Sequence, residues 1–126
     1  MTWKGKERRQ FPRADFPCRI VVGFPSQSLT SRIENIGRGG VRVILEEKLN
    51  HFDIVGLVIF PSNDKSIKCE GRVVWVVERV NPTEGQPIMF DTGIEFITIS
   101  DPDREYIKNL VDKILSSKEN LKEKNK

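Results

Sequence analysis

The stretch Thr30–Leu45, TSRIENIGRGGVRVIL, is the most informative about the fold of this chain. After the glycine-rich GRGG of Gly37–Gly40, apolar residues recur at every second position. A period of two is typical of half-buried strands, and glycines between two strands are typical of a tight hairpin turn. We therefore predict strands over 30–36 and 41–45, joined by a hairpin.

The same period of two continues on both sides of this hairpin. Further strands are expected at 17–24, 54–60, 66–80 and 92–99. Within 66–80, Gly71 is expected to form a bulge or corner, and Val73, Trp75 and Val77 have the same parity, which predicts that they share the core face. Six strands with glycine at a corner predict an all-β fold, a small six-stranded antiparallel β-barrel.

The period changes to that of a helix near the end of the chain. Apolar residues recur there at helical spacing: Ile107, Leu110, Val111, Ile114 and Leu115. Ser100 or Asp101 is the expected N-cap, and Pro102 suits the first helical position. We predict one C-terminal α-helix that completes a domain over 14–116, followed by a charged, disordered tail over 117–126.

Composition and charge limit the size of the protein and the kind of partner it binds. The chain has 126 residues, of which 31% are charged and 37% hydrophobic, and its net charge is +3. This length predicts one compact domain. The basic arm over 1–13 carries +4 and the tail over 117–126 carries +2, which leaves −3 on the body over 14–116. An acidic body with one basic arm suits a small anion bound at one place better than a long nucleic acid.

Several classes of protein are not expected. The apolar run 54–60 is too short to span a membrane, and the polar start of the chain lacks a signal peptide, so we expect a cytoplasmic protein. Cys18 and Cys69 stand apart without a CxxC motif, and His51 is the only histidine. We therefore expect no metal, no cofactor and no catalytic residue.

Two short segments could bind an anionic nucleotide. Arg9 and Arg13 lie on an arm that Pro12 keeps from being helical, and guanidinium groups can fork onto phosphates and stack on bases. Asn35 offers the donors and acceptors that a base edge requires. The glycines after it permit positive φ and let a ligand lie against the backbone. Each segment alone is more often a solvated terminus or a tight turn.

Together, these residues resemble the PilZ domain, a bacterial receptor for the second messenger cyclic di-GMP. Arg9–Arg13 matches the family motif RxxxR, and Asn35–Gly40 matches [D/N]xSxxG except that Gly37 stands in the place of the serine. GRVVWVV at 71–77 and TGIEFI at 92–97 are similar to later strands of the family. The resemblance covers about Glu7 to Leu115 and implies a barrel of the split-barrel type.

The resemblance also implies a site and a function. Arg9 and Arg13 would hold the phosphates and stack on guanine, Asn35 would bond a guanine edge, and Gly40 would let the ligand approach the strand. The arm would close over the ligand and signal to a protein partner. Arg8 occupies the place that in the family accompanies an intercalated ligand dimer. Independently of the resemblance, Arg42 lies on a strand just past Asn35, which favours an auxiliary ligand contact over ordinary surface charge. The glycine at Gly37 removes one hydroxyl contact, which predicts weaker binding.

Two other functions remain open. A PilZ-like interaction module with weak or lost ligand binding is favoured by Gly37 but opposed by the two arginines and Asn35. A small basic-armed barrel that binds single-stranded nucleic acid would need aromatic residues interleaved with basic ones, and the aromatic residues here mostly occupy core positions.

Overall fold

The computed structural model describes residues 13–23, 28–79, 85 and 87–124. It contains seven strands and one helix: β1 (Arg13–Asp15), β2 (Arg19–Gly23), β3 (Ser28–Gly37), β4 (Gly40–Leu45), β5 (Ile54–Ser62), β6 (Lys65–Arg79), β7 (Met89–Thr98) and α1 (Asp101–Lys124). Phe24 and Val80, which we placed at strand ends, lie outside the described residues.

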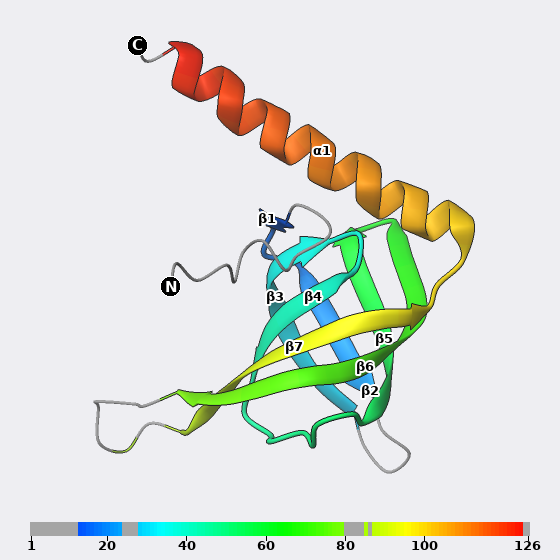
Figure 1. Cartoon of the computed structure of the whole chain (residues 1–126), viewed down its shortest axis with the longest axis vertical. Helices are drawn as coiled ribbons and strands as arrows, with labels where there is room; N and C mark the ends of the chain where they lie inside the picture. The colour runs from blue at the N-terminus through cyan, green and yellow to red at the C-terminus, as the bar shows by residue number, and fades with distance from the viewer. Residues whose placement is uncertain (1–12, 24–27, 80–84, 86, 125–126) are drawn as a thin grey trace, which may run out of the picture.

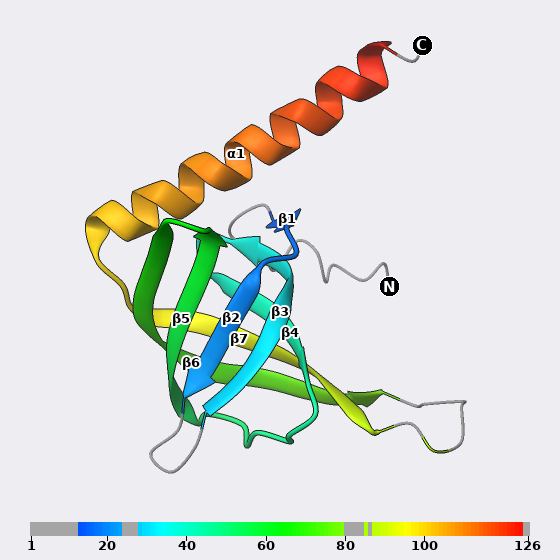
Figure 2. The ribbon, with the colours of Figure 1, turned by 180° about the vertical axis from the view of Figure 1, so that it is seen from behind.

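Six of the strands form a closed antiparallel barrel, as the sequence predicted. The strands run in the order β3-β2-β5-β6-β7-β4, and β4 pairs back with β3 to complete the ring. The additional strand β1 is three residues long and pairs with the end of β3. Figure 1 looks onto β4 and β7, whereas Figure 2, from behind, looks onto β2 and β5.

The inside of the barrel is filled by branched aliphatic side chains that alternate along the strands. Those with no exposed surface include Ile20, Val22, Ile33, Ile36, Val41, Val43, Ile59, Ile67 and Val73. Cys18 belongs to the same cluster, where it packs as a small buried hydrophobic side chain. This burial is the main source of stability for a domain of this size.

Strand β6 has two irregularities, one predicted and one not. The pairing with β7 shifts between Glu70 and Gly71, where a bulge or corner was expected. It shifts again between Val73 and Trp75, which reverses the inward and outward positions. Trp75 is therefore 39% exposed on the outer face, and Val77 is exposed as well. Our expectation that both share the core parity of Val73 was wrong because a bulge leaves no periodic signal.

Helix α1 begins as predicted and ends later than predicted. The Ser100 side-chain oxygen accepts a hydrogen bond of 3.2 Å from the backbone N–H of Asp103, which makes Ser100 the N-cap. Ile107 and Val111 are buried against the barrel. The helix continues to Lys124, so our prediction of a disordered tail from residue 117 was wrong over 117–124. Lys, Glu and Leu dominate that segment and have high helix propensity.

The helix lies across one end of the barrel and extends beyond it (Figures 1 and 2). Lys65, at the start of β6, ties the first turn of the helix to the barrel through an ion pair of 3.3 Å with Asp103. The Lys65 ammonium also lies 4.9 Å from the ring centre of Tyr106. Within the described residues, no helix has the length and apolar character that crossing a membrane requires.

Candidate ligand-binding site

The pairing of β1 with β3 brings the two sequence motifs together. Arg13, the last residue of RxxxR, is opposite Gly37, and Asp15 is opposite Asn35. The Arg13 Nε atom donates a hydrogen bond of 2.7 Å to Asn35 Oδ1. Residues that are 22 positions apart in the sequence therefore form one polar surface.

A bulge in β3 turns Asn35 toward this surface. The pairing with β4 shifts between Ile33 and Asn35, so that Ile33 and Ile36 both point into the core. Asn35 then points outward, yet it is only 8% exposed because Arg13 lies across it. Bulges commonly re-aim a side chain beside a functional site.

The hairpin turn is built differently from our expectation. We expected its glycines to permit positive φ, but in the described part of the chain positive φ occurs at Phe52 (73°) and Gly85 (87°). Gly40 has another reason to lack a side chain. A Cβ atom there would overlap the carbonyl oxygen of Ile94 and lie 2.9 Å from the Cα of Glu95. Gly40 is thus required by the close approach of β7.

Arg42 is held by a carboxylate of the neighbouring strand. Its Nε and one terminal nitrogen donate to the two oxygens of Asp91 over 2.7 and 2.6 Å. These bonds raise the pKa of Arg42 above its ordinary value, although its partial burial acts in the opposite direction. The guanidinium is fixed in place beside Asn35, its partner across the β3–β4 pair.

Trp75 and Gly93 belong to the same surface and were not predicted as site residues. Trp75 pairs with Gly93, which in turn pairs with Arg42. The Trp75 indole lies on the bare backbone of Gly93, where a Cβ atom would overlap the ring. The sequence does place a tryptophan and a glycine in two neighbouring strands. Only the register across the bulge, however, shows that these two residues are in contact.

The surface contains a shallow depression of about 70 Å³. It is lined by Arg13, Gly39, Gly40, Val41, Val74, Trp75, Gly93, Ile94 and Glu95. Glu95 of β7, one of these residues, forms an ion pair of 3.2 Å with Arg72 of β6. Glycine backbone, the Trp75 ring and Arg13 all line the depression, and such groups suit a flat, anionic molecule.

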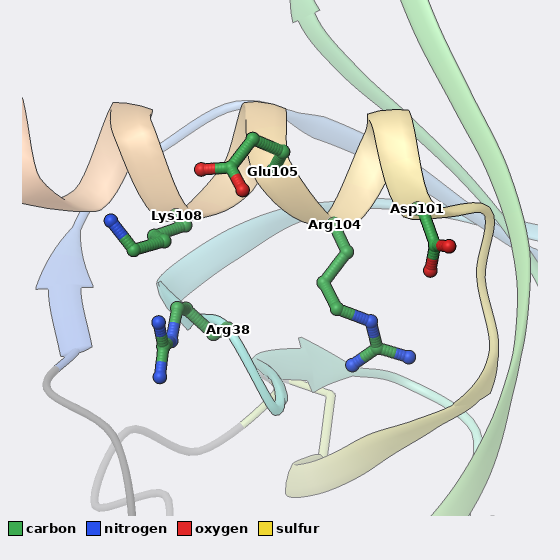
Figure 3. A pocket seen from close by; sticks show the side chains of 5 residues that line it. All are labelled: Arg38, Asp101, Arg104, Glu105 and Lys108. Atoms are coloured by element: carbon green, nitrogen blue, oxygen red, sulfur yellow. The ribbon is translucent and has the colours of Figure 1, made fainter.

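A larger cleft, of about 330 Å³, lies between the β3–β4 turn and α1 (Figure 3). It is lined by Arg38 of the turn and, along one side of the helix, by Asp101, Arg104, Glu105 and Lys108. All five side chains are charged. The helix therefore faces the hairpin here with solvated polar groups, and its apolar contacts lie on the barrel end.

Comparison with known proteins identifies the family. The family model described as the PilZ domain matches residues 7–113. The chain belongs to the PilZ domain family. No curated protein matches this PilZ domain, but its fold recurs in solved structures.

Three solved structures illustrate this recurrence. The Bacillus subtilis inhibitor of motility MotI/DgrA is 20% identical, with a TM-score of 0.72 over 88% of this chain and 52% of that protein. Escherichia coli YcgR in complex with c-di-GMP is 12% identical, with a TM-score of 0.75 over 94% of this chain and 51% of YcgR. The PilZ domain of YcgR with c-di-GMP is 12% identical, with a TM-score of 0.72 over 93% of this chain and 98% of that domain. The chain spans about half the length of MotI and of YcgR in the complex with c-di-GMP.

The predicted site residues that the structure describes lie on neighbouring strands. Arg13, Asn35, Gly37, Gly40 and Arg42 come from β1, β3 and β4, which pair in that order. Arg8 and Arg9 lie outside the described residues. The roles of all seven residues toward a ligand stay predictions.

Proposed function

We propose that this PilZ domain is a non-catalytic receptor for cyclic di-GMP, and that the ligand binds on the outer face of β3, β4 and β7 beside Arg13. The observation that carries the proposal is the hydrogen bond between Arg13 and Asn35, because it unites the two motifs of the family in one surface. A small anion bound at one place also suits an acidic body with a basic arm.

The chemistry of the surface matches both parts of such a ligand. Arg13 bonds Asn35 through its Nε, and a guanidinium group forms strong charge-assisted hydrogen bonds with phosphates. The Asn35 side-chain NH₂ supplies donors for a guanine edge. The Trp75 ring beside Gly93 offers an aromatic plane next to the depression, and the fixed Arg42–Asp91 pair offers both signs of charge.

Other parts of the proposal concern residues outside this surface. Arg8 and Arg9 would complete the phosphate contacts as the arm closes over the ligand, and Arg8 would favour an intercalated ligand dimer. The occupied domain would act on a protein partner in the bacterial cytoplasm, where a receptor of this family meets the second messenger.

A second candidate function is an interaction module with weak ligand binding. Gly37 favours it, because the family serine is missing directly opposite Arg13. Single-stranded nucleic acid is less well supported. Trp75 is one aromatic ring on this face, whereas strand tracking needs several such rings among basic residues.

Titration calorimetry with cyclic di-GMP tests the proposed function. We expect binding of cyclic di-GMP in preference to GTP and linear diguanylate, because two guanines and two phosphates are needed to engage both motifs. Arg13→Ala should weaken binding by about 1.5–3 kcal/mol, the range for charge-assisted hydrogen bonds. Lys113→Ala, on the exposed side of α1, is the charge-matched control and should leave affinity unchanged. Absence of heat at about 100 μM ligand would exclude any useful affinity and refute the proposal.

A further inference from the structure

The opposite side of the barrel carries a second surface, formed by the outward residues of β2 and of the strands beside it (Figure 2). The register places Arg32, Arg19 and Phe60 in one row across β3, β2 and β5. In the next row, Val58 of β5 is opposite Lys68 of β6. In the row after that, Gly23 of β2 is opposite Gly56 of β5. We call Arg19, Arg32, Lys68, Val58, Gly23 and Gly56 the β2–β5 face.

Among the described residues, the cationic side chains of this face form no ion pair with a carboxylate, in contrast to the arginines on the other side of the barrel. On the β4–β7 side, Arg42 pairs with Asp91 and Arg72 pairs with Glu95. In the part of the chain that the structure describes, Arg19, Arg32 and Lys68 form no ion pair, although the body of the protein is acidic. Glu70, beside Gly56, only partly offsets their charge.

The arrangement of the two arginines is unfavourable for the isolated barrel. Arg19 and Arg32 are directly opposite each other on β2 and β3, and like charges at such positions destabilise a sheet. The Arg19 guanidinium lies 3.9 Å above the Phe60 ring, which holds it in place but does not neutralise it. An anionic partner would relieve the repulsion.

Nothing within the described barrel requires glycine at the two glycine positions of this face. A Cβ atom added at Gly56 would have no atom of the described residues within 4 Å, and one added at Gly23 would meet only the Gly56 carbonyl oxygen at 3.7 Å. Both have φ outside the left-handed region. Glycine within a strand is less stable than residues with side chains, and it often marks the close approach of another backbone. Gly40, Gly71 and Gly93, in contrast, are required by neighbouring atoms.

We propose that the β2–β5 face docks an acidic segment of a partner protein, whose carboxylates bond Arg19, Arg32 and Lys68 while its backbone lies over Gly23 and Gly56. A protein segment is favoured over nucleic acid because the Phe60 ring is covered by Arg19 and is not open for base stacking. Strand β3 contributes Arg32 to this face and Asn35 to the Arg13 surface, so the two surfaces are neighbours along that strand.

A defined peptide tests this docking. The probe is a fluorescein-labelled peptide of alternating glutamate and valine, compared with the same peptide containing glutamine and with labelled oligothymidylate. We expect the acidic peptide to bind, to weaken as salt is raised, and to shift the NMR amide resonances of Gly23 and Gly56. These results require no cyclic di-GMP, so they are independent of the proposed ligand.

Variants separate this face from non-specific attraction. Arg19→Glu and Arg32→Glu should each weaken binding of the acidic peptide by about tenfold or more, whereas Lys113→Glu on α1 should leave that binding unchanged. Gly56→Thr should also weaken it while raising the melting temperature, because threonine favours a strand. The proposal would be overturned if the acidic peptide did not bind, or if the glutamine peptide bound equally well. It would also be overturned if both arginine variants kept their affinity, or if this face preferred oligothymidylate.

Discussion

At the level of single residues, the glycines of this barrel fall into two groups: those at which a side chain would clash with neighbouring atoms, and those at which it would not. A side chain at Gly40 or Gly71 would meet atoms of β7, and one at Gly93 would meet the Trp75 ring. Gly56 has open space around it within the described part of the chain. Gly37 is a buried residue of β3, paired with Arg13 on one side and with Gly40 on the other.

Gly37→Ser should strengthen binding of cyclic di-GMP two- to tenfold, a gain of about 0.5–1.5 kcal/mol from one added hydrogen bond. Positive φ at this position would have strained a serine, but Gly37 is extended strand. The melting temperature should therefore change little. Calorimetry and thermal unfolding check both points. A lower melting temperature without tighter binding would show that the family's serine role does not carry over to position 37.

At the level of elements, the parts that depend on local sequence could be predicted, and those that depend on register could not. The hairpin, the start of α1 and the bulge at Gly71 follow from glycines, a capping serine and periodicity. The second bulge in β6 lies in the uniform run VVWVV and has no marker in the sequence. The meeting of Arg13 with Asn35 could be expected only through the family resemblance, because β1 is too short to be recognised from its own residues.

The cap of α1 gives a prediction at this level. Ser100→Ala should lower the free energy of unfolding by about 1 kcal/mol, because the Asp103 N–H would lose its acceptor. Ser100→Asp keeps an acceptor and should behave like the wild type. Urea denaturation measures both. Equal loss in the two variants would mean that the cap does not hold the first turn.

At the level of the whole molecule, a closed barrel presents different chemistry on opposite faces of one core. The β4–β7 face carries paired arginines beside Arg13, whereas the arginines of the β2–β5 face form no ion pair with any described residue. Helix α1 packs on the barrel end between them, and its contacts with strands include β1 and β3. Both motif-bearing strands therefore contact the helix.

The buried Cys18 and the half-buried Cys69 predict how stability depends on pH. Burial raises the pKa of Cys18 and of Cys69 from 9.0 to about 11; Arg32 opposes the shift at Cys18, and Asp103 adds to it at Cys69. The unfolded chain then loses these protons first as pH rises, so stability declines as pH rises from 9.0 toward about 11.

Urea denaturation across this pH range should show that the free energy of unfolding of the wild type declines as pH rises. The double variant Cys18→Ala, Cys69→Ala should show a smaller decline. The same slope in both proteins would assign the decline to other groups. Both thiols should also react slowly with iodoacetamide near neutral pH, because the thiolate is the reactive form.

An NMR titration of the full chain with cyclic di-GMP distinguishes the two faces of the barrel in one experiment. If the ligand binds beside Arg13, the amide resonances of Asn35, Gly37, Gly40 and Gly93 and the Trp75 indole resonance shift together, while those of Gly23 and Gly56 stay in place. Saturable shifts confined to the β2–β5 face, or no shifts around Arg13 and Asn35, would contradict binding at this surface.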